Sequence, residues 1–290
     1  MTHGKAILNA LTVDVEDYFH VQAFAGVIPP HTWDSFESRV ENNTRRVLDM
    51  LAEHDLKATF FVLGWEAERR PGLVRRIAED GHEVACHGYG HQLIYRIGPD
   101  AFREDVGRAK ALLEDITGES VTGYRAPSYS ITAQSLWALD ILIECGFEYD
   151  SSIFPVIHDT YGIPDAPRFP HVIERPSGSL LEFPASTFEL RAFGMRMRLP
   201  VAGGGYLRLF PVRALRGAIR SINRRESRPA VLYFHPWELD TGQPRIKAGL
   251  KSRFRHTVNL HKTEAKVRKL ISDLPFGPMR QVLKQGRWRV

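Results

Sequence analysis

The sequence predicts an α/β fold in which a parallel β-sheet closes into a distorted barrel of the TIM type. Two observations lead to this prediction. Short apolar, β-branched runs alternate with amphipathic helical patterns through the first half of the chain, and a further buried-type strand, Val231–Phe234, returns late in the sequence. Such alternation favours a parallel sheet covered by helices, and 290 residues suffice for one barrel with a self-supporting core.

The first half of the chain is expected to contain five strands separated by helices. The expected strands are Ile7–Val13, Ala58–Leu63, Glu83–Cys86, Val121–Ala126 and Phe147–Ile153. Ser35 and Thr132 are expected to cap the first and last of the helices between them, and Pro71 to begin the second. Glycines are expected to end helices because they adopt the left-handed conformation at low cost; they are Gly81, Gly118 and Gly146.

The second half is less regular. Between about residues 155 and 210, short runs such as SLLEF and MRMRL predict an antiparallel insert. A last helix is expected from about Thr263 to Leu274. Because no linker-like segment interrupts the chain, we expect a single domain over residues 1–290, in which residues 241–290 form a basic, helical C-terminal extension packed on the barrel.

Composition narrows the class of protein. With 43% hydrophobic and 25% charged residues the chain has ordinary globular composition, and two cysteines cannot form a disulfide framework. The apolar run near the N-terminus is short and leads into acidic residues, which is typical of a strand and not of a signal peptide. No apolar stretch approaches about 18 residues. We therefore expect a cytoplasmic protein without a transmembrane segment.

Positive charge is concentrated at the end of the chain. The net charge is +5, and from Arg245 onward there are 13 Lys or Arg residues against only Glu264 and Asp273. Such a region can contact a membrane surface or an anionic glycan, or can simply be a solvated basic face. The sequence shows no nucleic-acid recognition motif, so no nucleic-acid partner is expected.

Polar residues follow the ends of several predicted strands. They are Asp14, Glu16 and Asp17 after the first strand, His87 and His91 after the third, Arg125 after the fourth and His235 after the last. Because the active sites of parallel barrels lie at the carboxyl ends of the strands, these side chains are expected to meet on one rim.

These residue types suggest a hydrolytic metal site. His87 and His91 have the i, i+4 spacing that lets two imidazoles grip one ion, and two histidines with one carboxylate leave positions open for water and substrate. Zinc is the expected metal. Asp14 and Glu16 alternate onto the same side of an extended chain, so that one can bind metal while the other acts as general base; the competing interpretation is an acidic loop that caps a neighbouring helix.

Two further residues complete the expected machinery. Arg125 can pair with the base carboxylate and hold it ionised and oriented, or can be part of a structural salt bridge. His235 can protonate a leaving amine, or can be a hydrogen-bonded core histidine.

Five segments resemble the motifs of one enzyme family, the NodB-type polysaccharide deacetylases of carbohydrate esterase family 4. The segments, in chain order, are TVDVED, GHEVACHGYGH, YRAPSY, YDSSIFP and LYFHPWE. The resemblance runs from about residue 7 to 240. From His235 onward the chain resembles the subgroup associated with exosortase (PEP-CTERM) exopolysaccharide loci.

The resemblance implies a (β/α)7 barrel, a divalent metal and specific roles. Carried over by position, Asp14 is the base, Arg125 its tether and His235 the acid, while His87 and His91 bind metal. The backbone N–H of Ser128 is implied to help form an oxyanion hole.

One departure concerns the first motif. The family has two adjacent aspartates, whereas here Val15 follows Asp14, which moves the metal carboxylate to Glu16 or Asp17. Strand alternation favours Glu16, and the shorter reach typical of the family favours Asp17.

The function expected from the resemblance is metal-dependent removal of N-acetyl groups from an amino-sugar polysaccharide or its precursor, in exopolysaccharide biosynthesis. The partner is then an N-acetylated glycan. Two alternatives stay open: hydrolysis of another amide, such as a cyclic imide or ureide, and a catalytically inactive glycan-binding module. The sequence does not identify the natural glycan, the cellular metal or the oligomeric state.

Overall fold

The computed structural model describes residues 6–192, 195–286 and 288. The first five residues, and residues 287, 289 and 290 of the predicted basic extension, lie outside the described residues. Among the described residues, no helix combines the length and apolar character needed to cross a membrane.

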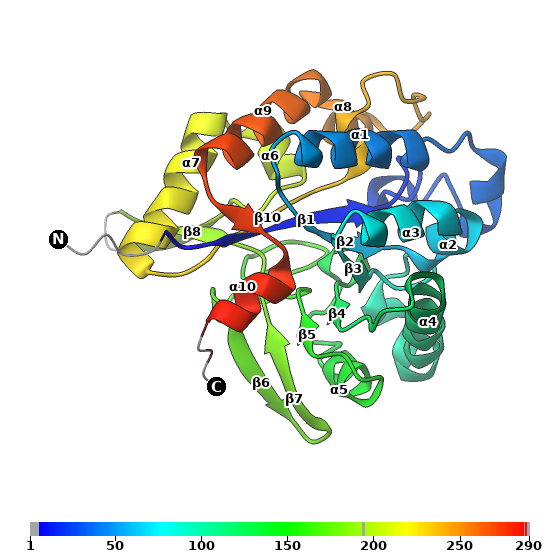
Figure 1. The fold of residues 1–290 in the computed structure, drawn as a ribbon, viewed down its shortest axis with the longest axis horizontal. Coiled ribbons are helices and arrows are strands. Elements are labelled where there is room, and N and C mark those ends of the chain that lie inside the picture. The colour runs from blue at the N-terminus through cyan, green and yellow to red at the C-terminus, as the bar shows by residue number, and fades with distance from the viewer. Residues whose placement is uncertain (1–5, 193–194, 287, 289–290) are drawn as a thin grey trace.

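A curved sheet of parallel strands forms the centre of the fold (Figure 1). Its parallel strands lie in the order β10 (Val231–Phe234), β1 (Asn9–Val15), β2 (Thr59–Val62), β3 (Glu83–Cys86), β4 (Gly123–Tyr124), β5 (Tyr149–Asp150) and β7 (Gly178–Glu182). The antiparallel strand β6 (His171–Arg175) borders β7, and β11 (Phe276–Gly277) pairs with β1. Within the described residues no ladder joins β6 to β10, so the barrel is open there.

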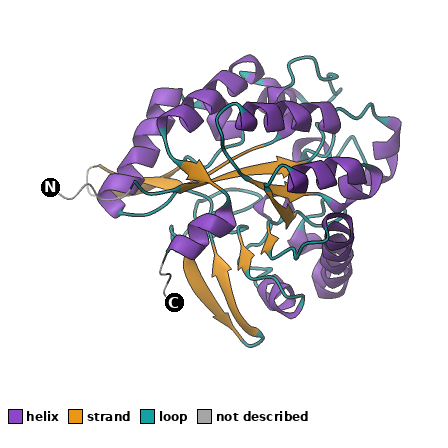
Figure 2. Cartoon of the chain, in the orientation of Figure 1, coloured by secondary structure: helices purple, strands orange, loops and turns teal. Residues whose placement is uncertain are grey.

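Helices cover the sheet (Figure 2), most of them on its outer side, whereas the last helix packs against Phe61 and Ala85 on the inner side. They are α1 (Val40–Ala52), α2 (Gly64–Arg69), α3 (Pro71–Glu79), α4 (Ile94–Thr117), α5 (Trp137–Glu144), α6 (Gly205–Leu209), α7 (Val212–Ser221), α8 (Leu250–Thr257), α9 (Leu260–Asp273) and α10 (Met279–Gln285). Apolar strand residues such as Val13, Phe60 and Val62 are fully buried against the helices in one large core cluster. The expected α/β architecture with a C-terminal helical extension is therefore present.

The region expected to be an antiparallel insert does contain two antiparallel hairpins. One joins β6 to β7, and the other joins β8 (Thr187–Ala192) to β9 (Met195–Pro200). The SLLEF run also belongs to the main sheet, however, because most of it lies in β7, which pairs in parallel with β5 as the seventh parallel strand. Burial of Leu180 and Glu182 fits this inner position.

Two predicted caps are wrong. Ser35 ends a short 3-10 helix, η2 (Pro30–Ser35), and α1 begins only at Val40, where a carboxylate from a distant segment takes the capping role. Thr132 does not begin α5, which starts at Trp137. By contrast, Gly118 ends α4 in the left-handed conformation, as predicted.

A glycine contact secures the end of the sheet at β10. Gly203 bridges Tyr233 in parallel fashion, Tyr233 N–H donates to the Ala202 carbonyl at 2.7 Å, and Gly204 N–H donates to the Tyr233 carbonyl at 3.1 Å. Gly203 has φ +149°, and a Cβ added there would lie 1.7 Å from the Tyr233 oxygen. Only glycine therefore allows the two backbones to approach so closely.

Replacement of Gly203 by alanine is predicted to lower the free energy of unfolding by on the order of 3 kcal/mol, because the new methyl group forces the loop away from β10. The matched control is Gly107→Ala in the middle of α4, where an added Cβ meets nothing within 4 Å. That change is predicted to be neutral or to stabilise by up to about 1 kcal/mol. Urea unfolding measures both; equal stabilities of the two variants would contradict the prediction.

Candidate functional site

The end of β1 carries two acidic side chains toward the same side of the sheet. Val13 and Val15 pack into the large core cluster, and the alternation of an extended chain turns Asp14 and Glu16 to the opposite side. Both carboxylates are almost fully buried, at 2% and 3% exposure. Their close placement is thus a direct consequence of strand geometry.

Asp17 is placed differently, and the competing interpretation of an acidic helix cap applies to it. Its Oδ2 accepts hydrogen bonds from Ser38 Oγ at 2.6 Å, Arg39 N at 2.8 Å and Val40 N at 3.1 Å. These donors include backbone groups at the start of α1 that no intrahelical bond can satisfy. Burial raises the pKa of Asp17 despite these bonds. The structure therefore brings Glu16, and not Asp17, to the histidines.

The two histidines follow β3 in a tight turn. His87 Nδ1 lies 2.7 Å from the Arg125 carbonyl, and donation of its proton to this oxygen leaves Nε2 with a free lone pair. His91 adopts a left-handed backbone with φ 48°. Asp105, which sequence reasoning missed, holds the turn by accepting from Tyr89 N and Gly90 N, both at 2.8 Å.

Glu16, His87 and His91 form a buried cluster with the properties of a metal site. One ligand atom of each lies within 4.8 Å of the others, and His91 Nε2 is 2.7 Å from Glu16 Oε2. That oxygen is buried and, apart from this contact with His91, has no polar partner among the described residues. A buried carboxylate oxygen with so few partners calls for further compensation of its charge, which a cation held by two imidazoles and one carboxylate supplies.

The protonation of the cluster suits the same role. Burial lowers the pKa of His87 to about 4, so its imidazole is neutral near pH 7. Burial alone would raise the pKa of Glu16, but the charges of His91 and His235 hold it well below its ordinary value. His87 and Glu16 are thus in the deprotonated forms that metal ligands require, and a bound metal would replace the proton on His91.

Arg125 lies beneath the site and is completely buried. Its Nη1 donates to Asp14 Oδ1 at 2.6 Å and to Thr12 Oγ1 at 2.8 Å, while Nη2 donates to Ser151 Oγ at 3.1 Å. Burial would lower the pKa of the guanidinium, but Asp14 raises it. The predicted pairing of Arg125 with Asp14 is present; Thr12 and Ser151 are additional partners.

His235 faces both carboxylates from the end of β10. Its Nε2 lies 3.2 Å from Glu16 Oε1 and 4.0 Å from Asp14 Oδ2, and its Nδ1 lies 2.9 Å from Glu238 Oε2. Burial would lower its pKa, but Glu16, Glu238 and Asp14 raise the pKa to about 9. The imidazole is thus both oriented and able to carry a proton at neutral pH.

Sequence reasoning missed the residues that hold His235. Glu238 Oε1 accepts from Arg208 Nε at 2.6 Å, and both side chains are buried. Burial would raise the pKa of Glu238, but Arg208 and His235 lower it to about 2. The carboxylate three residues after His235 in LYFHPWE is a signal that could have identified Glu238, whereas Arg208 lies 30 residues away from it in sequence.

Ser128 lies in a turn between β4 and α5. It is half-buried and left-handed, with φ 54°, and Tyr129 follows with φ 53°. Two consecutive non-glycine residues in this region are uncommon and are found mostly where a backbone group must be aimed. The turn begins directly after Arg125 and Ala126, so its backbone adjoins the site.

A pocket of about 180 Å³ adjoins His91. Its walls include the aromatic rings of Phe19, His20 and Trp33 and the polar side chains of Gln92 and Arg96. Sequence analysis had singled out none of these five residues. They come from the segment after β1, from the turn before α4 and, for Arg96, from the first turn of α4, which only the fold brings together.

Comparisons with known proteins show what parts of the chain are similar to. Residues 30–149 match the model of the family "Polysaccharide deacetylase", and residues 151–284 match a domain of unknown function, DUF3473. A peptidoglycan-N-acetylglucosamine deacetylase from Bacillus cereus is 35% identical over 98 residues, which are 33% of this chain and 36% of that protein. A chitooligosaccharide deacetylase from Sinorhizobium fredii is 34% identical over 128 residues, 43% of this chain and 57% of that protein.

The chain thus covers between about a third and little over half of these relatives' lengths. A crystal structure from Mycobacterium smegmatis, of a protein described as a polysaccharide deacetylase, superposes with a TM-score of 0.65 over 98% of this chain and 91% of that one, at 23% identity. This likeness confirms the predicted fold class. Residues 30–149 are thus similar to the family "Polysaccharide deacetylase", and the relatives that match parts of the chain are named as deacetylases.

Proposed function

We propose that this protein hydrolyses N-acetyl groups on amino-sugar glycans, releasing acetate and a free amine, with a divalent metal held by Glu16, His87 and His91. The observation that carries the proposal is the buried Glu16 carboxylate, which lies close enough to His87 and His91 to share one ion with them and faces His235. The relatives are named as deacetylases of N-acetylglucosamine in peptidoglycan and of chitooligosaccharides, which supports the substrate class.

A divalent metal, with zinc as the first candidate for this donor set, would supply a Lewis acid that polarises the acetyl carbonyl and lowers the pKa of water. The protein's own groups perform the proton transfers. Asp14 takes a proton from the attacking water, and the Arg125 guanidinium donates to this carboxylate and fixes it in position. The water oxygen then forms a bond to the acetyl carbon, which becomes tetrahedral.

Collapse of the tetrahedral centre requires a proton on the leaving nitrogen. His235 donates it from Nε2 as the C–N bond breaks, and Glu238 holds the imidazole through Nδ1. The backbone N–H of Ser128 is proposed to stabilise the negative charge on the acetyl oxygen, a contribution of about 3 kcal/mol for a well-placed donor. Acetate and an amino sugar are the products.

The pocket beside His91 is proposed to hold a sugar next to the one that reacts. Rings such as Phe19 and Trp33 offer apolar faces to a pyranose, and Gln92 and Arg96 offer hydrogen-bond donors for hydroxyl or carbonyl oxygens.

The proposal also covers the domain organisation of the chain, its biosynthetic role and its location. We propose that the chain acts as one catalytic domain, because the site draws on residues from Asp14 to Glu238. A role in exopolysaccharide biosynthesis, membership of the exosortase-associated subgroup and a cytoplasmic location are also proposed, as is contact of the basic region 241–290 with a membrane or an anionic glycan.

Metal content tests the choice of ligand. Glu16→Gln is predicted to lose zinc during dialysis, because an amide supplies no negative charge. Asp17→Ala is predicted to retain zinc and to lose about 2 kcal/mol of unfolding free energy, because the start of α1 loses its cap. Elemental analysis and urea unfolding measure the two effects. Zinc retention by Glu16→Gln together with zinc loss by Asp17→Ala would reverse the assignment.

Acetate release from N-acetylglucosamine oligomers tests the reaction. Release is predicted with zinc present and none after chelation. Asp14→Asn and His235→Asn are each predicted to lower turnover by about 10²- to 10⁴-fold while circular dichroism stays unchanged. Wild-type turnover in both variants would refute the proposed roles.

Two outcomes of the same assay would point to the alternative functions. Hydrolysis of a cyclic imide or ureide, in place of the oligomers, would assign the site to another amide. Binding of the oligomers without any hydrolysis would identify a glycan-binding module.

A further inference from the structure

Helix α8 exposes large apolar side chains to solvent. Leu250 is 82% exposed and Phe254 is 61% exposed, and their i, i+4 spacing places them on one face of the helix. In the loop between β5 and β6, Ile157 is 89% exposed. Single exposed apolar residues are ordinary, but a group of them on one surface marks an interaction site.

The loop and the helix are linked through α6. His158 stacks on Tyr161 at a centroid distance of 3.8 Å, and the Tyr161 hydroxyl lies 3.3 Å from the hydroxyl of Tyr206 on α6. Arg208 of α6 in turn donates to the His256 carbonyl of α8 at 2.7 Å. Burial lowers the pKa of His158, Asp159 opposes this, and the charges of Arg255 and Lys251 add smaller lowering effects. The charge of Arg255 also reaches Tyr161. Ile157 therefore belongs to the same side of the molecule as α8.

Exposed cations surround these apolar side chains. No Asp or Glu occurs from Thr241 to Thr263. Six exposed residues in this stretch carry positive charge. One of them, Lys262, belongs to α9, and the other five lie on α8 or in the segment before it. None of these five has a carboxylate partner among the described residues; they are Arg245, Lys247, Lys251, Arg253 and Arg255. We call the group of Ile157, Leu250 and Phe254 with these five cations the α8 surface.

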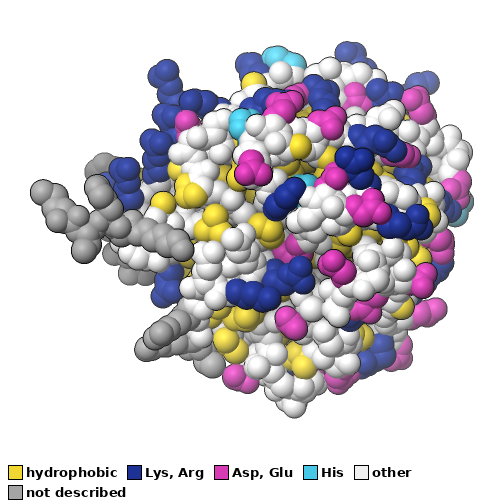
Figure 3. Space-filling view, in the orientation of Figure 1, with side chains coloured by type: hydrophobic (Ala, Val, Ile, Leu, Met, Phe, Trp, Pro, Cys, Tyr) yellow, Lys and Arg dark blue, Asp and Glu magenta, His cyan; other side chains and the backbone are white. Residues whose placement is uncertain are grey.

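The rest of the basic region differs from the α8 surface. On α9, Arg268 pairs with Glu53 and Glu264, and Lys269 pairs with Asp273. Figure 3 likewise shows Lys and Arg interspersed with Asp and Glu over the face that it displays. Neutralised pairs of this kind are typical of a solvated face. Most of the cations without a carboxylate partner among the described residues of the C-terminal region therefore lie on α8 or in the segment before it.

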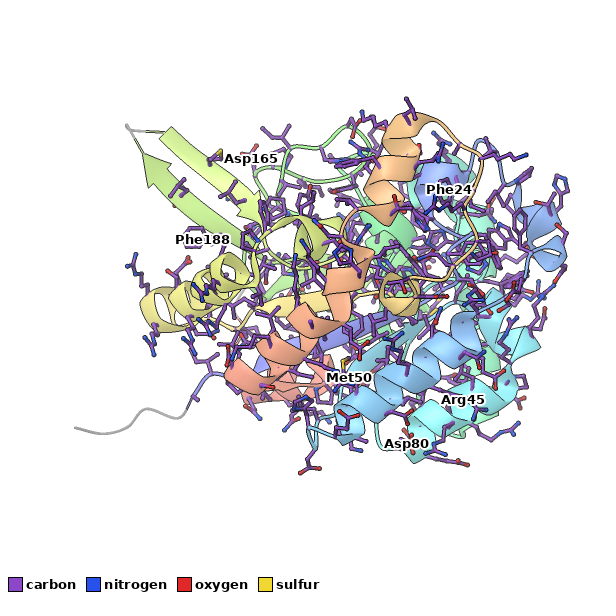
Figure 4. The ribbon with its side chains drawn as sticks, turned by 90° about the horizontal axis from the view of Figure 1, so that it is seen from above. Phe24, Arg45, Met50, Asp80, Asp165 and Phe188 are labelled. Atoms are coloured by element: carbon purple, nitrogen blue, oxygen red, sulfur yellow. The ribbon has the colours of Figure 1, made fainter. Side chains whose placement is uncertain are left out.

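The α8 surface also adjoins the candidate site. The buried His256 of α8 stacks on Trp237 at a centroid distance of 4.5 Å, and Trp237 stacks on His235 at 5.3 Å. Phe24, from the segment after β1, packs against His256 at 4.7 Å, and Figure 4 shows Phe24 beside α8, at the end of the molecule opposite the β8–β9 hairpin near Phe188.

We propose that the α8 surface docks the protein on a membrane that contains anionic lipids. Leu250, Phe254 and Ile157 would enter the interface between headgroups and acyl chains, and the five cations would bind the lipid headgroups. Exposed apolar side chains next to unpaired cations can bind acyl chains and anionic headgroups together. A polyanion in solution would bind the cations but would leave the apolar side chains exposed to water. A second copy of the chain is disfavoured, because a two-fold interface would place the same cations against each other.

Docking in this way would bring the site close to the lipid headgroups. Together with the proposed function, on which this step rests, membrane docking identifies the substrate as a glycan held at a membrane, for example by a lipid carrier. The docking itself does not depend on catalysis.

Vesicle co-sedimentation tests the proposal. Wild-type protein is expected to bind phosphatidylcholine vesicles with 30% phosphatidylglycerol, to bind pure phosphatidylcholine vesicles at least tenfold more weakly, and to lose binding as salt rises. Leu250→Ser with Phe254→Ser is expected to weaken binding about tenfold, and Lys251→Gln with Arg253→Gln to do the same. The matched control is Leu190→Ser with Met197→Ser, which removes two exposed apolar side chains from the β8–β9 hairpin and is expected to leave binding unchanged.

Three results would overturn the proposal. The first is no binding of the wild type to anionic vesicles. The second is that the control variant loses as much vesicle binding as the α8 variants. The third is self-association in analytical ultracentrifugation that the Leu250 and Phe254 changes abolish. Acetate release from soluble oligomers by the Leu250→Ser, Phe254→Ser variant should equal that of the wild type. Failure of the deacetylase proposal would therefore be seen in acetate release, and failure of docking in the vesicle assay.

Discussion

The candidate site depends on one completely buried residue, Arg125. Its guanidinium holds the Asp14 carboxylate, and its backbone carbonyl accepts the Nδ1 proton of His87. One residue therefore orients both the proposed base and a proposed metal ligand. Removing one partner of a buried ion pair costs about 3–5 kcal/mol, since it leaves an uncompensated charge. The strands β1, β3 and β4 are consequently held in register by the same contacts that shape the site.

The backbone geometry at the end of β1 determines which acidic side chain lies next to His87 and His91. Extended backbone through Val15 keeps Asp14 and Glu16 on one side, and the chain then turns so that Asp17 meets the start of α1. An acid placed directly after Asp14 would point to the core side of the strand if the extended backbone were kept. The single residue between Asp14 and Glu16 is thus compatible with a metal centre that uses Glu16. Asp17 has a different role and caps the start of α1.

Periodicity predicted the strands and most helices because it reports burial directly, and the parallel order predicted that Asp14, Glu16, His87, His91, Arg125 and His235 would meet. Sequence reasoning failed where a contact joins distant segments. Ser35 was a plausible local cap, but Asp17 supplies the bond from another element. Arg208 holds Glu238 across 30 residues, and the pairing of β7 with β5 depends on a long connection. Such contacts leave no periodic signal.

The most direct test of the account is anomalous diffraction at the zinc absorption edge from crystals of the zinc-loaded protein. The account predicts one peak within about 2.0–2.2 Å of Glu16 Oε2 and of one imidazole nitrogen each from His87 and His91, with no peak at Asp17. A peak that Asp17 coordinates in place of Glu16 would contradict the ligand assignment. No peak anywhere near the two histidines would contradict the metal centre itself.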